Sequence, residues 1–192
     1  MANGFLTKTY SAVSILVSLF IILGILYPLF LLGIGKLCFP YQTNGSLISR
    51  KGAIIGSELI QQEFTGSKLF HGRPSIVVAS NTPTSKLMLD RIEKRIAIDQ
   101  KLNAEEGKPV PIDLITDSGS GVDPDISPRA AYYQAVRVSR ANHIPLDSVK
   151  KLIAKNTKGR DLGFLGPPTV NVLNLNLALI DSLSETRGKR SH

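Results

Sequence analysis

The sequence predicts an α/β or α+β protein with one transmembrane helix near the N-terminus and one soluble domain that has a small sheet and several helices. Two observations support this prediction. No charged residue occurs from Thr9 to Gly35, whereas charges are spread along the whole chain after Lys36. In that second part, short apolar runs typical of strands alternate irregularly with amphipathic helical patterns, so both kinds of element are expected there.

The uncharged segment is long enough to cross a membrane. Its 27 residues span about 40 Å as a helix at ~1.5 Å per residue, which exceeds the roughly 30 Å hydrocarbon core. We place the transmembrane helix at residues 11–35, after an N-terminal tail at residues 1–10. A cleaved signal peptide is disfavoured, because the apolar run is about twice as long as a signal-peptide core and no A-x-A-like site follows it.

Three serines fall on one face of the predicted transmembrane helix. Ser11, Ser14 and Ser18 are spaced i, i+3, i+7. Small residues let another helix approach closely in lipid, where the hydrophobic effect does not bring helices together. These serines are therefore candidate packing residues against a partner helix. The alternative is that they have no specific role in the membrane.

Charge gives expectations about partners and orientation. Lys8 flanks one end of the apolar segment and Lys36, Arg50 and Lys51 follow the other, which leaves the orientation undecided. The net charge of +8 is compatible with anionic membrane lipid as a partner, and also with ordinary solubility. Basic residues are not interleaved with aromatic ones, so nucleic acid is not expected as a partner.

The soluble domain is expected at residues 41–184, followed by a basic tail at residues 185–192 that frays at the terminus. Its clearest boundary is Ser127-Pro128, because serine caps helix N-termini and proline is favoured at the first helical position. Local patterns predict a hairpin at 45–60, strands at 75–79, 110–116 and 169–173, and helices at 87–102, 128–141, 147–155 and 175–183.

A Gly/Ser loop is the first candidate functional site. Ser118, Gly119, Ser120 and Gly121 follow a predicted strand, where hydroxyls and backbone N–H groups can bind phosphate. The loop lacks the Gly-Lys-Ser/Thr of a Walker motif, and its glycines occupy positions where an EF-hand needs oxygen ligands, so no metal is expected. The alternative is a tight loop whose glycines permit positive φ and whose serines bond to the backbone.

His71 and Arg73 are the second candidate site. A histidine and an arginine close to a strand start can bind an anion or transfer a proton, but no nucleophile is placed beside them by spacing. No H-E-x-x-H, paired cysteines or G-x-S-x-G motif is present. The residues alone therefore leave open a membrane-anchored extracytoplasmic binding protein or hydrolase, and a purely structural role for the histidine.

Several segments occur together in a specific order along the chain. They are Gly56-Ser57-Glu58-Leu59-Ile60, Phe70-His71-Gly72-Arg73-Pro74-Ser75, Ser118-Gly119-Ser120-Gly121-Val122-Asp123-Pro124, Ile126-Ser127-Pro128-Arg129-Ala130-Ala131-Tyr132-Tyr133-Gln134, Leu162-Gly163-Phe164-Leu165-Gly166 and Asn171-Val172-Leu173-Asn174-Leu175-Asn176-Leu177-Ala178-Leu179. This ordered set strongly resembles the C subunit of the Kdp-type potassium-transporting ATPase of bacteria. The resemblance runs from the membrane helix to about Leu179.

The resemblance implies a non-catalytic accessory subunit of a potassium uptake complex in the plasma membrane. Its partners would be a channel-like A subunit and a B subunit that hydrolyses ATP. The C subunit would stabilise the assembly and raise the ATP affinity of the B subunit, with the loop at Ser118–Gly121 as a nucleotide-contacting element. The N-terminus would be cytoplasmic and the soluble domain outside.

Two of these implications conflict, because a domain outside the membrane cannot contact cytoplasmic ATP. If the domain is outside, its effect on ATP must be a coupling transmitted through the other subunits. We therefore expect coupling, with no cofactor of the chain's own. A purely structural assembly factor remains an alternative.

Overall fold

The computed structural model describes residues 2–50, 52–74, 86–103 and 107–190. The strand expected at residues 75–79 lies outside the described residues. Internal contacts divide the chain into two compact units, Met1–Leu47 and Ile48–His192.

The first unit is dominated by one long helix. It consists of α1 (Ala2–Ile21), a π-helical turn η1 (Ile22–Leu26) and α2 (Tyr27–Cys38). Helix therefore also covers residues 2–10, which were expected to form a tail. The segment Thr7–Cys38 has 32 residues, and its most apolar 18-residue stretch has a mean hydropathy of 2.8 and no buried residue, so the segment is long and apolar enough to cross a membrane.

The π-helical turn lies directly before Pro28. Proline has no backbone N–H, and its ring collides with the carbonyl four residues earlier in a regular α-helix, here that of Gly24. The wider turn contains this carbonyl, and the N–H of Tyr27 donates to the oxygen of Ile22, five residues back. The proline is thus accommodated by one widened turn without ending the helix.

A short helical segment follows the long helix. It is α3 (Pro40–Thr43), and the hydroxyl of Tyr41 donates to the carbonyl of Ser46 (3.2 Å). The predicted hairpin is confirmed, since β1 (Leu47–Arg50) pairs with β2 (Ala53–Ser57).

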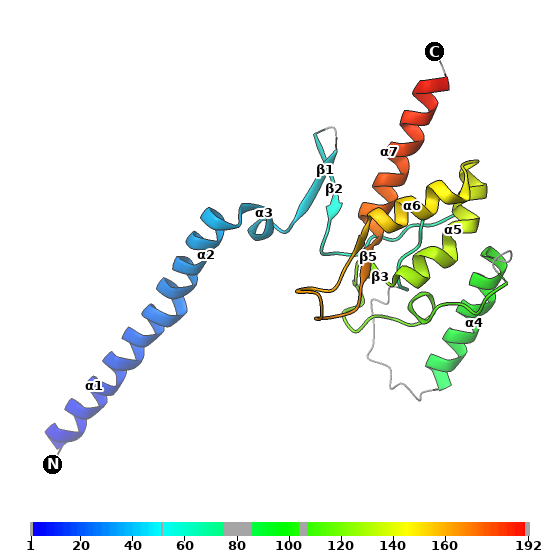
Figure 1. The fold of residues 1–192 in the computed structure, drawn as a ribbon. Helices are drawn as coiled ribbons and strands as arrows, with labels where there is room; N and C mark the ends of the chain where they lie inside the picture. Colours follow the sequence, from blue (N-terminus) through cyan, green and yellow to red (C-terminus); the bar gives the residue numbers. More distant parts are fainter. Residues whose placement is uncertain (1, 51, 75–85, 104–106, 191–192) are drawn as a thin grey trace. The chain divides into compact units, whose positions relative to one another are not determined.

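The second unit combines helices with a small antiparallel sheet, so the predicted α/β class is confirmed (Figure 1). Its further elements are α4 (Lys86–Leu102), the 3-10 helix η2 (Ile112–Leu114), β3 (Asp125–Ile126), α5 (Pro128–Asn142), α6 (Leu146–Lys155), β4 (Thr157–Lys158), β5 (Thr169–Asn171) and α7 (Val172–Arg190). The strand order is β3-β5-β4, and Val170 in the central strand is paired with Ile126 on one side and with Thr157 on the other.

The strand expected at residues 110–116 is wrong. This segment contains η2, and the hydroxyl of Thr116 donates to the carbonyl of Ile112 (2.8 Å). Pro109 and Pro111 explain the difference, because proline cannot donate to a sheet ladder and is rare inside strands. The apolar residues of this segment therefore do not form a strand.

The last strand and the last helix also differ from expectation. The strand ends at Asn171, two residues earlier than expected, because the side chain of Asn171 accepts the backbone N–H of Asn174 (3.1 Å) and so caps the helix that begins at Val172. That helix continues to Arg190, although residues 185–192 were expected to be frayed.

The core lies mainly between α5, α6, α7 and the sheet. As predicted, Ser127 caps α5: its hydroxyl accepts the N–H of Ala130 (3.2 Å), with Pro128 at the first helical position. The largest fully buried apolar side chains are Phe70, Ile126, Val138, Val149, Ile153, Val170, Leu175 and Leu179. Phe70 comes from a segment without regular secondary structure, so polar contacts must hold that segment in place.

Candidate functional site

The two candidate sites of the soluble domain, the Ser/Gly loop and the pair His71 and Arg73, belong to two polar networks in the second unit. The Arg73 network joins Arg73 to the Ser/Gly loop. The Arg137 network joins His71 to the buried face of α5.

The Ser/Gly loop is closed by hydrogen bonds within itself. The backbone N–H of Gly121 donates to the carbonyl of Ser118 (3.2 Å), and the hydroxyl oxygen of Ser120 accepts the N–H of Val122 (3.3 Å). The two serine hydroxyls lie 3.4 Å apart. Gly121 has a φ of 72°, a conformation that glycine adopts without strain. This arrangement agrees with a tight structural loop, and nucleotide contact by residues 118–121 stays a prediction.

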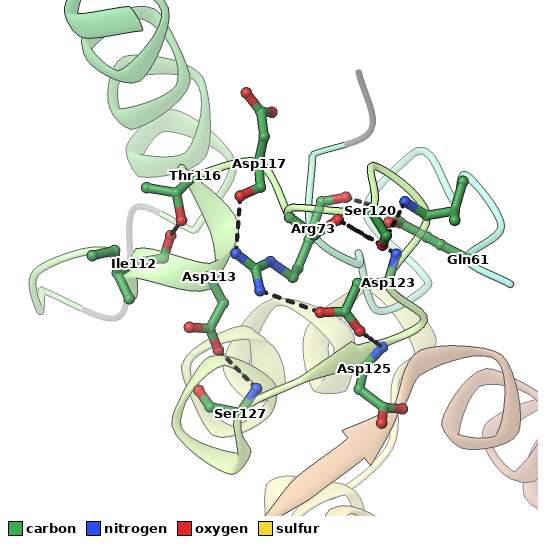
Figure 2. Close-up of polar contacts among 12 residues, drawn as sticks. Gln61, Arg73, Ile112, Asp113, Thr116, Asp117, Ser120, Asp123, Asp125 and Ser127 are labelled. Atoms are coloured by element: carbon green, nitrogen blue, oxygen red, sulfur yellow. Dashed lines mark hydrogen bonds and ion pairs between the residues drawn. The ribbon is translucent and has the colours of Figure 1, made fainter. Parts of the chain in front are cut away.

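Arg73 ties the two ends of this loop together, as Figure 2 shows. Its Nη1 donates to Oδ2 of Asp123 (3.2 Å) and its Nη2 donates to the carbonyl of Asp117 (3.1 Å). The other carboxylate oxygen of Asp123 accepts the N–H of Asp125 (3.1 Å). Gln61 adds a further link, because its side-chain amide donates to the carbonyl of Arg73. The structure thus brings both candidate segments together, with the arginine bound to protein groups.

A second arginine fixes the loop to α4. Nη1 of Arg95 lies 2.7 Å from Oδ1 of Asp117, an ion pair whose geometry does not make it a hydrogen bond. The same Nη1 donates to the carbonyl of Ile115 (3.3 Å). Asp117 and Asp123 therefore each face an arginine. In the part of the chain that the structure describes, no arginine is paired with Asp125, and burial raises the pKa of its carboxyl group above the ordinary value.

The cavity beside Arg73 is small. It has a volume of about 200 Å³ and is lined by His71, Arg73, Arg95 and Asp99 among others. Ligand pockets are ordinarily ~300–1,000 Å³. A larger open groove of about 590 Å³ is lined by Lys108, Arg129 and Lys150, but by no residue of the Ser/Gly loop. Neither of these cavities combines the loop with the space that a nucleotide needs.

His71 is held by the backbone and by Gln134. Its N–H donates to Oε1 of Gln134 (2.8 Å), whose Nε2 donates back to the carbonyl of His71 (3.0 Å). Its ring Nε2 lies 2.6 Å from the carbonyl oxygen of Gly66. Burial, and next the nearby Arg137 cation, lower the pKa of His71 from 6.5. The imidazole is therefore kept neutral, in contacts that position the chain.

Arg137 is the centre of this second network, and the sequence reasoning missed it. The residue is 7 % exposed. Its Nε donates to Asn103 (2.9 Å), its Nη1 to the carbonyls of Ser67 (2.6 Å) and Leu69 (2.9 Å), and its Nη2 to Gln134 (2.7 Å). Burial lowers the pKa of Arg137 to about 10, which leaves it charged at neutral pH. One signal was available, since helical spacing places Arg137 on the apolar face of α5.

Asparagines of α7 and of its cap complete the fixation of the irregular segments. The side chain of Asn176 accepts the N–H of Phe70 (2.8 Å) and donates to its carbonyl (2.9 Å). Asn171 donates to the carbonyl of Glu58 (2.9 Å), and Asn174 donates to its carboxylate (2.8 Å). These side-chain amides, together with that of Gln134, form the hydrogen bonds to backbone groups that neighbouring strands would form in a sheet.

The serines of the long helix are accessible in the first unit. Ser11 and Ser18 are exposed and Ser14 is half-buried. The hydroxyl of Ser11 donates to the carbonyl of Thr7 (3.0 Å), one turn earlier, so this polar group can be satisfied inside lipid. Packing of these serines against a partner helix stays a prediction. Among the described residues, no group of three or more His, Cys, Asp or Glu side chains is arranged to hold a metal ion.

Comparisons with known proteins agree with the resemblance. A family model described as KdpC, the K+-transporting ATPase c chain, matches residues 9–181. The chain is 47% identical over 169 residues to the potassium-transporting ATPase KdpC subunit of Acidobacterium capsulatum, covering 83% of this chain and 90% of the relative. It is 42% identical over 186 residues to the subunit of the same name from Methylobacterium nodulans, covering 85% and 91%. For that of Photorhabdus laumondii the identity is 44% over 188 residues, covering 92% and 97%.

Proposed function

Because the chain belongs to the KdpC family of K+-transporting ATPase subunits, we propose that it is a non-catalytic accessory subunit that raises the ATP affinity of the complex's ATP-hydrolysing subunit. In this proposal it also stabilises the assembly with that B subunit and with a channel-like A subunit. The transmembrane segment Thr7–Cys38 supports single-pass anchoring in the membrane of the transporter.

The internal bonding of the Ser/Gly loop is the observation that carries the proposed mechanism. The hydroxyl of Ser120 and the side chain of Arg73, which a phosphate would need, already bind the protein. Asp117 and Asp123 add negative charge beside the loop. Direct contact with ATP would require these bonds to break, so we favour an effect on ATP that is transmitted through the other subunits.

Such an effect is a coupling free energy between the site of this subunit and the site of ATP. If the subunit binds the ATP-loaded state of the complex more tightly than the empty state, ATP affinity rises by the same factor, which is about 5–150-fold for ~1–3 kcal/mol. The rigid networks around Arg73 and Arg137 support this role, because a fixed surface can distinguish two states of a partner.

The proposed orientation puts the N-terminus in the cytoplasm and the domain outside. Two single-cysteine variants, Lys8→Cys and Ser120→Cys, test it in a background where the exposed Cys38 is replaced by serine. In intact cells, a membrane-impermeant thiol reagent should label position 120 and not position 8. Labelling of position 8 alone would place the loop on the side of ATP and contradict coupling across the membrane.

The isolated chain tests the non-catalytic part of the proposal. Purified without the other subunits, it should neither hydrolyse ATP nor turn over other phosphate esters. Turnover that is lost on replacing His71 or Arg73 would instead support the alternative, a membrane-anchored extracytoplasmic hydrolase or binding protein. Replacing Arg129, which is exposed and lies outside both networks, serves as the control.

A further inference from the structure

The segment between β4 and β5 exposes an unusual group of apolar side chains. Leu162, Phe164 and Leu165 are 82%, 69% and 49% exposed. We call residues 160–166 the apolar turn. It projects from the body of the domain on the chain segment that leads into β5 (Figure 1). Contiguous exposed apolar surface on a soluble domain is typical of a binding or membrane-contacting site.

The apolar turn is rigid although it is exposed. Asp161 and Leu165 exchange two backbone hydrogen bonds of 2.9 Å, and the N–H of Phe164 donates to the carbonyl of Asp161 (3.2 Å). Leu162 and Gly163 have φ values of 53° and 83°. Leucine is rare in this left-handed region. The turn therefore holds its apolar side chains outward in one conformation.

Two charged side chains at the start of the turn have partners nearby. Nη1 of Arg160 donates to the carbonyl of Gly166 (3.2 Å), and Nζ of Lys158 lies 3.0 Å from the carboxylate of Asp161. Leaving water is costly for backbone groups without partners, so a turn that bonds to itself can enter an apolar environment at a smaller cost.

We propose that the apolar turn inserts into the headgroup–acyl boundary of an anionic lipid membrane. Charge complementarity supports lipid as the occupant. Three exposed cations precede or begin the turn in the sequence, Lys155, Lys158 and Arg160, and Asp161 is the one acidic residue between positions 155 and 166. Exposed Phe and Leu side chains flanked by cations are typical of segments that bind at the membrane interface.

The chain itself tethers the soluble domain to the membrane helix by a short connection. The transmembrane segment ends at Cys38 and β1 begins at Leu47, so eight residues connect them. Eight residues reach at most ~28 Å. Such tethering raises the effective concentration of lipid at the domain, so that insertion that is weak on its own becomes substantial. The helix and the turn would then be two independent membrane contacts.

The chain has no tryptophan, so one introduced indole reports on the turn alone. We would place Phe164→Trp, and separately the control Ile98→Trp, in the full-length chain. The replaced side chains are 69% and 68% exposed. Each variant is reconstituted without the other subunits into phosphatidylcholine vesicles, with and without phosphatidylglycerol, and with lipids that carry bromine on the acyl chain.

The proposal predicts blue-shifted emission and quenching by brominated lipid for Phe164→Trp, stronger with phosphatidylglycerol, and neither for Ile98→Trp. Combining Phe164→Trp with Lys155→Gln should lower the ratio of chains with an inserted turn to chains with a free turn about five-fold. Each cation near an anionic surface contributes about that factor to binding. Emission of Phe164→Trp like that of the control in both vesicle types would overturn the proposal. A shift that arises only in the assembled ATPase, without quenching by bromine, would assign the turn to a protein partner and overturn it equally. Neither result depends on the proposed effect on ATP.

Discussion

Replacing Arg137 should destabilise the domain far more than replacing an ordinary surface arginine. Arg137→Ala removes the charged donor from five oxygens that lie 2.6–3.2 Å from the guanidinium nitrogens, those of Gly66, Ser67, Leu69, Asn103 and Gln134. Hydrogen bonds to a charged group are worth ~1.5–3 kcal/mol each, but the losses within one network do not add. A buried acceptor left without a donor costs ~1–3 kcal/mol, so we expect a total loss of about 4 kcal/mol from these acceptors together.

Urea unfolding of the full-length chain in detergent, followed by far-UV circular dichroism, measures this loss. With a slope of ~1–3 kcal/mol per molar urea, a loss of about 4 kcal/mol lowers the midpoint by about 2 M. Arg137→Lys keeps the charge, but one ammonium group cannot replace the planar fork of donors. We expect it to lose about half as much.

Arg129→Ala is the matched control, because Arg129 lies on the same helix but is exposed. Its effect should stay within ~0.5 kcal/mol. A change of less than about 1 kcal/mol in the free energy of unfolding of Arg137→Ala would mean that this network does not hold the segment around His71 on α5.

Three further predictions concern titration and backbone conformation. Burial lowers the pKa of His71 from 6.5, so as the pH falls the unfolded chain binds a proton before the folded chain does. The domain therefore loses stability as the pH falls through 6.5. His71→Gln should flatten the pH dependence of the urea midpoint in this range. Gly121→Ala should cost about 1 kcal/mol because of the positive φ of Gly121, whereas Gly119→Ala, where a Cβ meets open space, should stay within ~0.5 kcal/mol in the same unfolding assay. Because burial raises the pKa of Asp125, its ionised carboxylate destabilises the folded state at neutral pH. Asp125→Asn should therefore raise the urea midpoint at neutral pH. This gain should vanish at a pH below 3.8, where the carboxyl group is protonated in both the folded and the unfolded chain.

Elements with local signals could be predicted from the sequence. The start of α5 follows from Ser127-Pro128, since cap and first-turn residues act within a few positions. The helix expected at residues 87–102 is confirmed as α4 within one residue, because its apolar stripe has helical spacing. The strand expected at residues 110–116 failed because apolar content was weighed above the effect of the two prolines.

The networks could not be predicted in the same way. Arg137 binds the carbonyl of Ser67, 70 residues away, and Asn176 binds Phe70 across 106 residues. A single sequence contains no signal that pairs such positions. The sequence did offer the structural alternative for the Ser/Gly loop, but its closure by Arg73 depends on a contact across 50 residues.

The ATP dependence of hydrolysis shows whether this chain raises the ATP affinity of the complex. The ATPase complex would be purified with and without this chain, and its initial rate measured against ATP concentration at saturating potassium. Where hydrolysis is slow relative to ATP dissociation, the KM follows the affinity for ATP, and we predict a KM lower by about 5–150-fold when the chain is present. The same KM in both preparations, once assembly of the remaining subunits is verified, would contradict it and leave a purely structural assembly factor.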